Sequence, residues 1–346
     1  MGARQTLGAV TDSDSSKAKR ATARGRLLPA NQEFAVFATV AVCFVAMALT
    51  MPSFLTLGNM FALTRGISVL GILALGMGIV VIARGIDLSQ VAVLASTCGI
   101  TVVLLNNGIP APVALGAGLF IAIGIGCLNG LLIAFVEIPA LFATLATGLL
   151  TLGATRALVL PQLIVYLGPE NAWLQQFGGN LSIGLPIPVI VFAVVALVMH
   201  VFLVHTVLGR SIYAQGDNPE TAWLTGMPVR PMIVTEYALS SAIGYIGGLV
   251  MVASTSLMHL QIADSSLIFD VILVVVLGGI SLTGGRGGVS SVIAGTLLIG
   301  ILLNGMTLLN LDTQTQNIIR GAVLLAAIVV DSLLHPHDEE TSKQGL

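Results

Sequence analysis

The stretch GISVLGILALGMGIVVIA (66–83) is 18 residues long and contains no charged side chain. A helix of about 20 apolar residues is long enough to cross the hydrocarbon core of a bilayer. Because similar runs recur along the chain, we expect an all-α polytopic membrane protein with about ten transmembrane helices. The expected spans lie near 34–51, 66–83, 90–106, 112–135, 140–160, 183–204, 232–253, 267–282, 289–309 and 317–334.

The composition supports this fold class. Of the 346 residues, 56% are hydrophobic and only 9% are charged, whereas a soluble domain has about 25% charged residues. Lipid must therefore cover much of the surface, and chains cross lipid only as helices or closed barrels. The apolar runs are continuous instead of alternating, which excludes a barrel. Glycines four residues apart, at Gly126 and Gly130 and at Gly244 and Gly248, predict that helices approach closely there.

The basic residues predict the orientation, because cytoplasmic loops carry an excess of Lys and Arg. We expect residues 1–33 to form a disordered basic cytoplasmic tail, 34–334 the transmembrane domain and 335–346 a second cytoplasmic tail. With an even number of spans, both termini lie in the cytoplasm. Of the 14 Lys and Arg residues, only Arg65, Arg156 and Arg320 then fall at or near the outer side.

Five spans in each half place the two halves in opposite orientations. Secondary transporters are often built from such inverted repeats, with a solute site near the middle of the bilayer. An ion-coupled secondary transporter of a small solute is therefore one hypothesis for the function.

The sequence contains no pattern typical of catalysis or of cofactor binding. A GxxxxGK[ST] phosphate-binding loop does not occur, and the glycines around Arg286 predict only a tight turn. The five histidines are scattered, so we expect no metal site. Without converging acid, base or metal groups, a membrane-embedded enzyme is the weakest hypothesis. No dense basic patch lies beyond the N-terminal tail, so no nucleic-acid partner is expected.

Carboxylates within or beside spans are costly in a membrane and are candidates for function. Asp87 follows Arg84 by three residues, so the two could form an ion pair on one helical turn. Asp270 lies in the first turn of its span, where the helix dipole stabilises it. Near the predicted cytoplasmic ends of spans, three further carboxylates could simply reach water: Glu137, Glu236 and Asp331.

A polar segment, GRSIYAQGDNPETAWLTGMPVR (209–230), interrupts the apolar sequence. Asn218 is placed to cap a short helix, with Pro219 at its first position and Glu220 in its first turn. Gly226 is placed to end this helix. Since little else in the chain could bind a soluble partner, this helix is the predicted docking site.

Four ordered motifs resemble the membrane permeases of bacterial ABC sugar importers, most closely the ribose, xylose and autoinducer-2 group. They are GIDLSQVAVLAS (85–96), NGLLIAFVEIPALFATLATGLLTLGATRAL (129–158), GRSIYAQGDNPETAWLTGMPV (209–229) and DVILVVVLGGISLTGGRGGVSSVIAGTLLIGILLNGM (270–306). Two places depart from the family pattern. Arg84 stands where glycine is usual, and Gln90-Val91-Ala92 replaces the usual Val-Gly-Ser.

The resemblance implies a permease subunit in the bacterial cell (inner) membrane that works with several partners. These are a separate ATP-binding subunit that holds ATP and Mg²⁺, a periplasmic or lipid-anchored solute-binding protein, and a second permease copy or paralogue. The chain itself would hold no cofactor. It would form the transmembrane path for a sugar or similar small polar solute.

The same resemblance makes the short polar helix the one that couples to the ATPase. Trp223 and Met227, four residues apart, would anchor it from one face. The full predicted coupling set is Gly216, Asn218, Glu220, Ala222, Trp223, Gly226 and Met227. Neutral or acidic polar residues in or beside spans are the candidates for the translocation path, and these are Asp87, Ser89, Ser96, Asn129, Thr144 and Asn304.

Overall fold

A computed structural model describes residues 28–181 and 184–334 of the chain. Every predicted span overlaps one of ten longer helices. These are α2 (Leu28–Thr50), α3 (Leu57–Ile82), α4 (Gln90–Asn106), α5 (Ala111–Ala134), α6 (Ala140–Leu158), α7 (Ile187–His205), α10 (Val229–Thr255), α11 (Leu267–Leu277), α12 (Val289–Leu308) and α13 (Thr313–Leu334). The predicted tails lie largely outside the described residues, although α2 begins at Leu28, before the expected end of the N-terminal tail.

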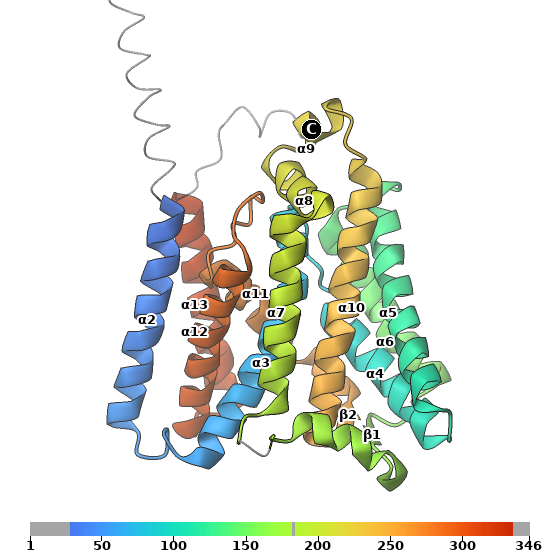
Figure 1. Cartoon of the computed structure of the whole chain (residues 1–346), viewed down its shortest axis with the longest axis vertical. Helices are drawn as coiled ribbons and strands as arrows, with labels where there is room; N and C mark the ends of the chain where they lie inside the picture. The colour runs from blue at the N-terminus through green and yellow to red at the C-terminus, as the bar shows by residue number, and fades with distance from the viewer. Residues whose placement is uncertain (1–27, 182–183, 335–346) are drawn as a thin grey trace, which may run out of the picture.

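The two ends of the helical bundle are built differently (Figure 1). One end, called here the α9 end, carries the short helices α8 (Val207–Asp217) and α9 (Pro219–Leu224). The other, the β1 end, carries β1 (Ile164–Tyr166) paired antiparallel with β2 (Leu257–His259). The 3₁₀ helices η1 (Pro169–Gly178) and η2 (Leu260–Asp264) flank these strands in sequence. Helix α2 begins and α13 ends at the α9 end (Figure 1).

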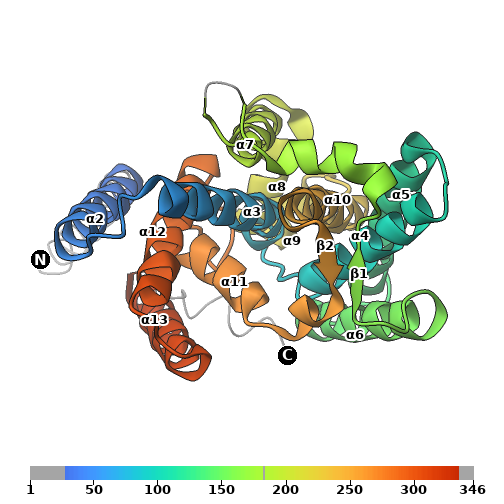
Figure 2. The same ribbon diagram turned by 90° about the horizontal axis from the view of Figure 1, so that it is seen from below.

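Helix α3 lies near the middle of the bundle, with α10 and α4 on one side and α11 and α12 on the other (Figure 2). Every residue of α3 from Ile67 to Ile82 is buried. Among the described residues, α3, α5, α6, α7, α10 and α12 are long and apolar enough to cross a membrane. Helices α4 and α11 are apolar but shorter, so the number of ten crossings stays a prediction.

Helix α5 packs very closely on α10 because of the glycines that the sequence singled out. A Cβ atom on Gly126 would lie 2.4 Å from the backbone oxygen of Tyr237, and one on Gly130 would lie 2.4 Å from the Cα atom of Val234. Gly248 of α10 faces Cys98 and Leu94 of α4 in the same way. The predicted close approach of helices at these positions is confirmed.

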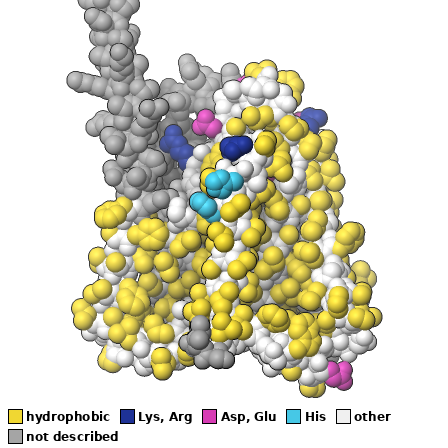
Figure 3. Space-filling view, viewed as in Figure 1, with side chains coloured by type: hydrophobic (Ala, Val, Ile, Leu, Met, Phe, Trp, Pro, Cys, Tyr) yellow, Lys and Arg dark blue, Asp and Glu magenta, His cyan; other side chains and the backbone are white. Residues whose placement is uncertain are grey.

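The surface has the distribution expected of a membrane protein. In Figure 3, hydrophobic side chains cover the middle of the molecule, while arginines and histidines gather towards the α9 end. Large exposed apolar residues such as Phe120, Leu149 and Leu197 lie on outward faces of α5, α6 and α7. In water such a surface would associate, whereas in a bilayer it is solvated.

Candidate functional site

A network of buried polar side chains, called here the Asp87 network, lies where the α3–α4 turn (83–89) enters the bundle. Its side chains come from the turn and from α5, α6 and α10, and each is at most 5% exposed. The members are Asp87, Ser89, Asn129, Thr144, Thr147 and Ser240. Hydrogen bonding is essential for such groups, because an unpaired polar group in an apolar interior costs several kcal/mol.

Asp87 accepts hydrogen bonds on both carboxylate oxygens. Its Oδ1 accepts from the backbone N–H of Ser89, at 3.1 Å, and from the hydroxyl of Ser89, at 2.6 Å. Its Oδ2 accepts from the hydroxyl of Ser240 on α10, at 2.9 Å. The carboxylate thus ties the α3–α4 turn to α10 through neutral donors.

The expected Arg84–Asp87 ion pair is wrong. Helix α3 ends at Ile82, and Arg84 has a φ of +69°, so the two residues do not share a helical turn. The left-handed conformation directs the Arg84 side chain to backbone oxygens of α8 instead. No ion pair of Asp87 occurs within residues 28–181 and 184–334.

Side chains of α5 and α6 complete the network. Asn129 Nδ2 donates to the Ser89 hydroxyl at 2.8 Å, and the Thr147 hydroxyl donates to Asn129 Oδ1. The Thr144 hydroxyl accepts from the backbone N–H of Leu88 at 3.1 Å. The structure therefore brings together four of the six predicted path residues, namely Asp87, Ser89, Asn129 and Thr144.

The other two predicted path residues lie elsewhere. Ser96 is buried on α4, and its hydroxyl has no partner among the described residues. Asn304 of α12 exchanges hydrogen bonds of 2.8 and 3.0 Å with Asn59 of α3. Asn304 also lines a cavity of about 460 Å³, which lies between α3, α10, α11 and α12 and includes Arg65.

The part that α10 plays in the network could not be seen in the sequence. Ser240 holds Asp87, and Glu236, one turn earlier, is 1% exposed and contacts Gln215 of α8 at 3.4 Å. The expectation that Glu236 reaches water is wrong, because its side chain is buried and accepts from Gln215 of α8. Asp331 lies outside the side chains that the structure describes. Glu137 is exposed, as expected, and pairs with Arg230 at 2.8 Å.

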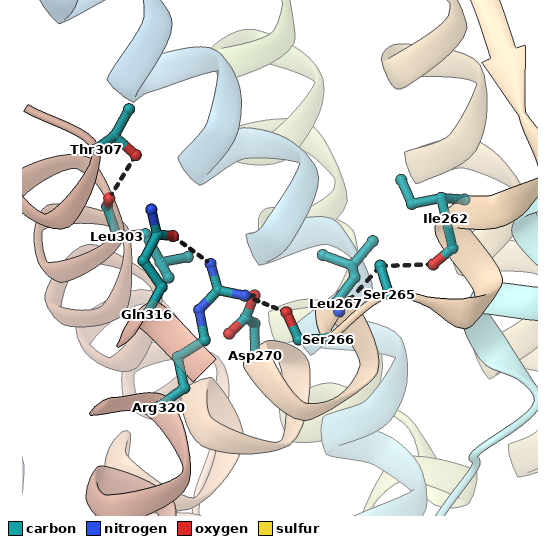
Figure 4. A network of polar contacts seen from close by, with 9 residues as sticks. All are labelled: Ile262, Ser265, Ser266, Leu267, Asp270, Leu303, Thr307, Gln316 and Arg320. Atoms are coloured by element: carbon teal, nitrogen blue, oxygen red, sulfur yellow. Dashed lines mark hydrogen bonds and ion pairs between the residues drawn. The ribbon is translucent and has the colours of Figure 1, made fainter. Parts of the chain in front are cut away.

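A second polar cluster, called here the Arg320 cluster, lies at the β1 end (Figure 4). Arg320 of α13 forms an ion pair with Asp270 of α11 at 3.3 Å, with the side chains 17% and 5% exposed. Arg320 also donates to the Ser266 hydroxyl and to Gln316 Oε1, the latter at 3.2 Å. The sequence placed Asp270 correctly in the first turn of α11 but missed this arginine as its partner.

Helix α9 forms as predicted. The Asn218 side chain accepts from the backbone N–H of Thr221 at 2.9 Å, and Pro219 is the first helical residue. Gly226 has a φ of +84°, which permits the chain reversal after the helix. Trp223 and Leu224 project from α9 with 68% and 70% of their surfaces exposed.

The predicted shared face of Trp223 and Met227 is wrong. Helix α9 ends at Leu224, and the N–H of Met227 bonds back to the oxygen of Ala222 at 3.1 Å, beyond the reversal at Gly226. Of the other predicted coupling residues, Glu220 is exposed, whereas Ala222 and Gly216 are buried. Helix α8 was also missed, although Thr206 caps it by accepting from the N–H of Gly209 at 3.0 Å.

Arginines divide between the two ends of the bundle. Arg84, Arg210, Arg230 and Arg286 belong to segments at the α9 end, whereas Arg65, Arg156 and Arg320 belong to helix ends near β1. Within the described part of the chain, no group of three or more His, Cys, Asp or Glu side chains could hold a metal ion.

Comparison with known proteins decides the family. Residues 59–328 match the family described as branched-chain amino acid transport system / permease component. The chain belongs to this permease family. The four motifs that resemble importer permeases all lie within the matched region. They include most of the turn of the Asp87 network and all of helix α9.

The permease is similar to several sugar permeases over most of its length. It is 34% identical to the ribose import permease of Escherichia coli over 282 residues, 81% of this chain and 88% of that protein. It is 33% identical to the ribose import permease of Bacillus subtilis, covering 87% of this chain and 92% of the relative. Identity to the L-arabinose transport system permease of Escherichia coli is 32%, covering 94% and 97%. No solved structure matches the chain significantly.

Membership of this family confirms the predicted class of protein and its location in the cell membrane. The main functional hypothesis, a transport permease, is supported over the ion-coupled alternative. The family is one of transport permease components.

Proposed function

We propose that this permease is the membrane subunit of an ATP-driven importer and forms the path for a sugar or similar small polar solute. The observation that carries the proposal is the similarity, over 81% to 94% of the chain, to permeases named for ribose and L-arabinose. Both solutes are small, neutral and rich in hydroxyl groups. A solute-binding protein would deliver the solute on the outer side, and a second permease copy or paralogue would complete the path.

The α9 end is proposed to face the cytoplasm. Four arginines belong to segments at this end and three to the β1 end. The other seven Lys and Arg residues lie in 1–27 and 335–346, which adjoin the ends of α2 and α13 at the α9 end. Such an excess of basic residues is typical of the cytoplasmic side. With the ten crossings predicted from the sequence, this orientation places both termini in the cytoplasm. The assignment is checked with Asp217→Cys and Gln175→Cys, each tested in intact cells with a maleimide that does not cross the membrane. Gln175→Cys should be labelled and Asp217→Cys should not. The opposite result for either variant would contradict the orientation.

The exposed end of α9 is proposed to dock a separate ATP-binding subunit. Trp223 and Leu224 are large apolar side chains that are mostly exposed, so they contribute little to the fold of the permease itself. Trp is also frequent among the residues that contribute most to binding at the centres of interfaces. Their neighbour Ala222 is buried and attaches the helix to the rest of the permease. A force applied to α9 would thus reach the bundle.

The docking site is tested by Trp223→Ala in the complex of permease, ATPase and binding protein. An exposed side chain contributes little to folding. Its loss should leave membrane insertion unchanged and the free energy of unfolding within about 0.5 kcal/mol of the original. Solute-stimulated ATP hydrolysis should fall by about tenfold or more, as for an interface hot spot. Leu309→Ala, which removes an exposed apolar residue between α12 and α13, is the matched control. Full stimulation in Trp223→Ala would overturn the docking site.

An ion-coupled secondary transporter is the second candidate. It follows from the ten predicted spans, because five in each half would place the halves in opposite orientations, as in transporters with inverted repeats. Uptake of the solute by vesicles that contain the permease alone, driven by a sodium or proton gradient, would favour it. The ATP-driven proposal predicts no such uptake.

A further inference from the structure

The C-terminal half of α8 is the place where separate parts of the permease meet. The Tyr213 hydroxyl donates to the oxygen of Gly287, in the loop before α12, at 2.9 Å. Gln215 contacts Glu236 of α10. Gly216 packs so tightly that an added Cβ atom would lie 1.9 Å from the oxygen of Ile82 at the end of α3. Because α9 follows directly after Asn218, whatever moves α9 also acts on this junction.

Arg84 makes two short, charge-assisted hydrogen bonds at the junction. Its Nε donates to the oxygen of Gly216 and its Nη2 donates to the oxygen of Asp217, both at 2.6 Å. These are the last two residues of α8, where backbone oxygens lack helical partners and the helix dipole favours a cation. Charge-assisted bonds of this kind are roughly twice as strong as neutral ones.

The surroundings of Arg84 are shaped to hold it. A Cβ atom on Gly284 would lie 2.4 Å from Arg84 Cγ, so only glycine leaves room for the arginine stem. The neighbouring Gly285 donates its N–H to the oxygen of Ile82 at 2.8 Å. The φ of +69° at Arg84 is unfavourable for any residue other than glycine, and this strain is the cost of directing the guanidinium to α8.

Three residues after Arg84 stands Asp87, the centre of the buried network. The intervening turn is short and is fixed at both ends, by Arg84 on α8 and by Asp87 on Ser240. We infer that Arg84 is a positioning residue that transmits movement of the ATPase-docking helix to the Asp87 network. This inference rests on the proposed function, because the movement would come from the ATPase.

The test compares Arg84→Gly, Arg84→Lys and a matched control, Arg210→Ala. The control removes an exposed arginine from α8, the helix that Arg84 contacts. Glycine accepts a positive φ without strain, so Arg84→Gly should fold and assemble with the ATPase as well as the original protein. In the full complex, the ratio of solute-stimulated to basal ATP hydrolysis should fall about fivefold, the lower range of coupling between sites. Arg84→Lys keeps the positive charge but not the planar guanidinium that donates two hydrogen bonds at once. Its ratio should therefore lie between those of Arg84→Gly and the original protein.

Hydrogen exchange in the purified permease provides a readout that needs no partner. In Arg84→Gly, backbone amides at the end of α8 and in residues 85–90 should both exchange faster, whereas Arg210→Ala should change neither set. Faster exchange in α8 alone, or an unchanged ATPase ratio in an active complex, would overturn the inference. If the original complex shows no solute-stimulated hydrolysis, the proposed function fails, and exchange still decides whether Arg84 links α8 to the turn.

Discussion

Two of the three buried carboxylates in the described part of the permease, Asp270 and Asp87, are satisfied in different ways. Asp270 is neutralised by Arg320, and that ion pair joins α11 to α13 at the β1 end (Figure 4). Asp87 is fully buried, and its carboxylate accepts from a backbone N–H and two serine hydroxyls, with no arginine or lysine partner among the described residues. An arginine ion pair with its further hydrogen bonds fixes two helices together, whereas hydroxyl donors can rotate to other acceptors. The comparison indicates a static clamp at one end and an adjustable network inside.

The largest effect is expected at the clamp. Arg320→Ala leaves the Asp270 carboxylate buried without a counter-charge, which typically costs about 3–5 kcal/mol. We expect reduced yield and a lower melting temperature in detergent. The double variant Arg320→Gln, Asp270→Asn removes both charges and should regain most of the loss. If the single variant is as stable as the original protein, the clamp is not structural.

A smaller loss of stability is expected from Asp87→Asn. The amide keeps the shape and one acceptor oxygen but loses the charge, so the free energy of unfolding should fall by about 1–3 kcal/mol. Because Arg84 is proposed to transmit movement to this network, solute uptake should fall by a larger factor than in Asp270→Asn. The measured quantity is solute uptake divided by the amount of folded protein. If it falls equally in the two variants, the claim that the clamp is static and the network adjustable is wrong.

The smallest effect is expected at Asp312, an exposed carboxylate before α13. Its Oδ1 accepts from the Thr315 hydroxyl at 2.6 Å, and this bond lowers the pKa of Asp312 below its ordinary value. Because the pKa of Asp312 is lower in the folded than in the unfolded state, the charged carboxylate stabilises the fold at pH values above its ordinary pKa. This stabilisation is lost as the pH falls through the pKa of the folded state. Asp312→Ala should therefore lower the melting temperature slightly at neutral pH. The variant should also lose this contribution to the pH dependence of stability. Both effects are measured by thermal unfolding between about pH 3 and pH 7, a range that includes the ordinary pKa of an aspartate.

Much of this arrangement could be predicted from the sequence, because it depends on local rules. Apolar length located all ten longer helices, and Asn218, Pro219 and Gly226 correctly delimited α9. The partners of the carboxylates could not be predicted in this way. Asp270 and Arg320 are 50 residues apart, and Asp87 and Ser240 are joined at a separation of 153.

Arg84 shows why local reasoning fails at turns. The three-residue spacing to Asp87 suggested an ion pair on one helical turn, but that inference holds only while the backbone stays helical. The left-handed conformation at Arg84 directs its side chain out of the turn and onto α8. The error at Met227 has the same origin, because Gly226 ends the helix before the expected four-residue spacing is complete.

The most direct test of the account is solute uptake by liposomes that contain the permease, its ATP-binding subunit and, on the outside, its solute-binding protein. Radiolabelled D-ribose and L-arabinose are offered with ATP and Mg²⁺ inside the liposomes. Uptake of at least one sugar should require ATP, the ATPase and the binding protein, and should fall about tenfold or more in Trp223→Ala. Uptake by the permease alone, driven by an ion gradient and unaffected by ATP, would contradict it.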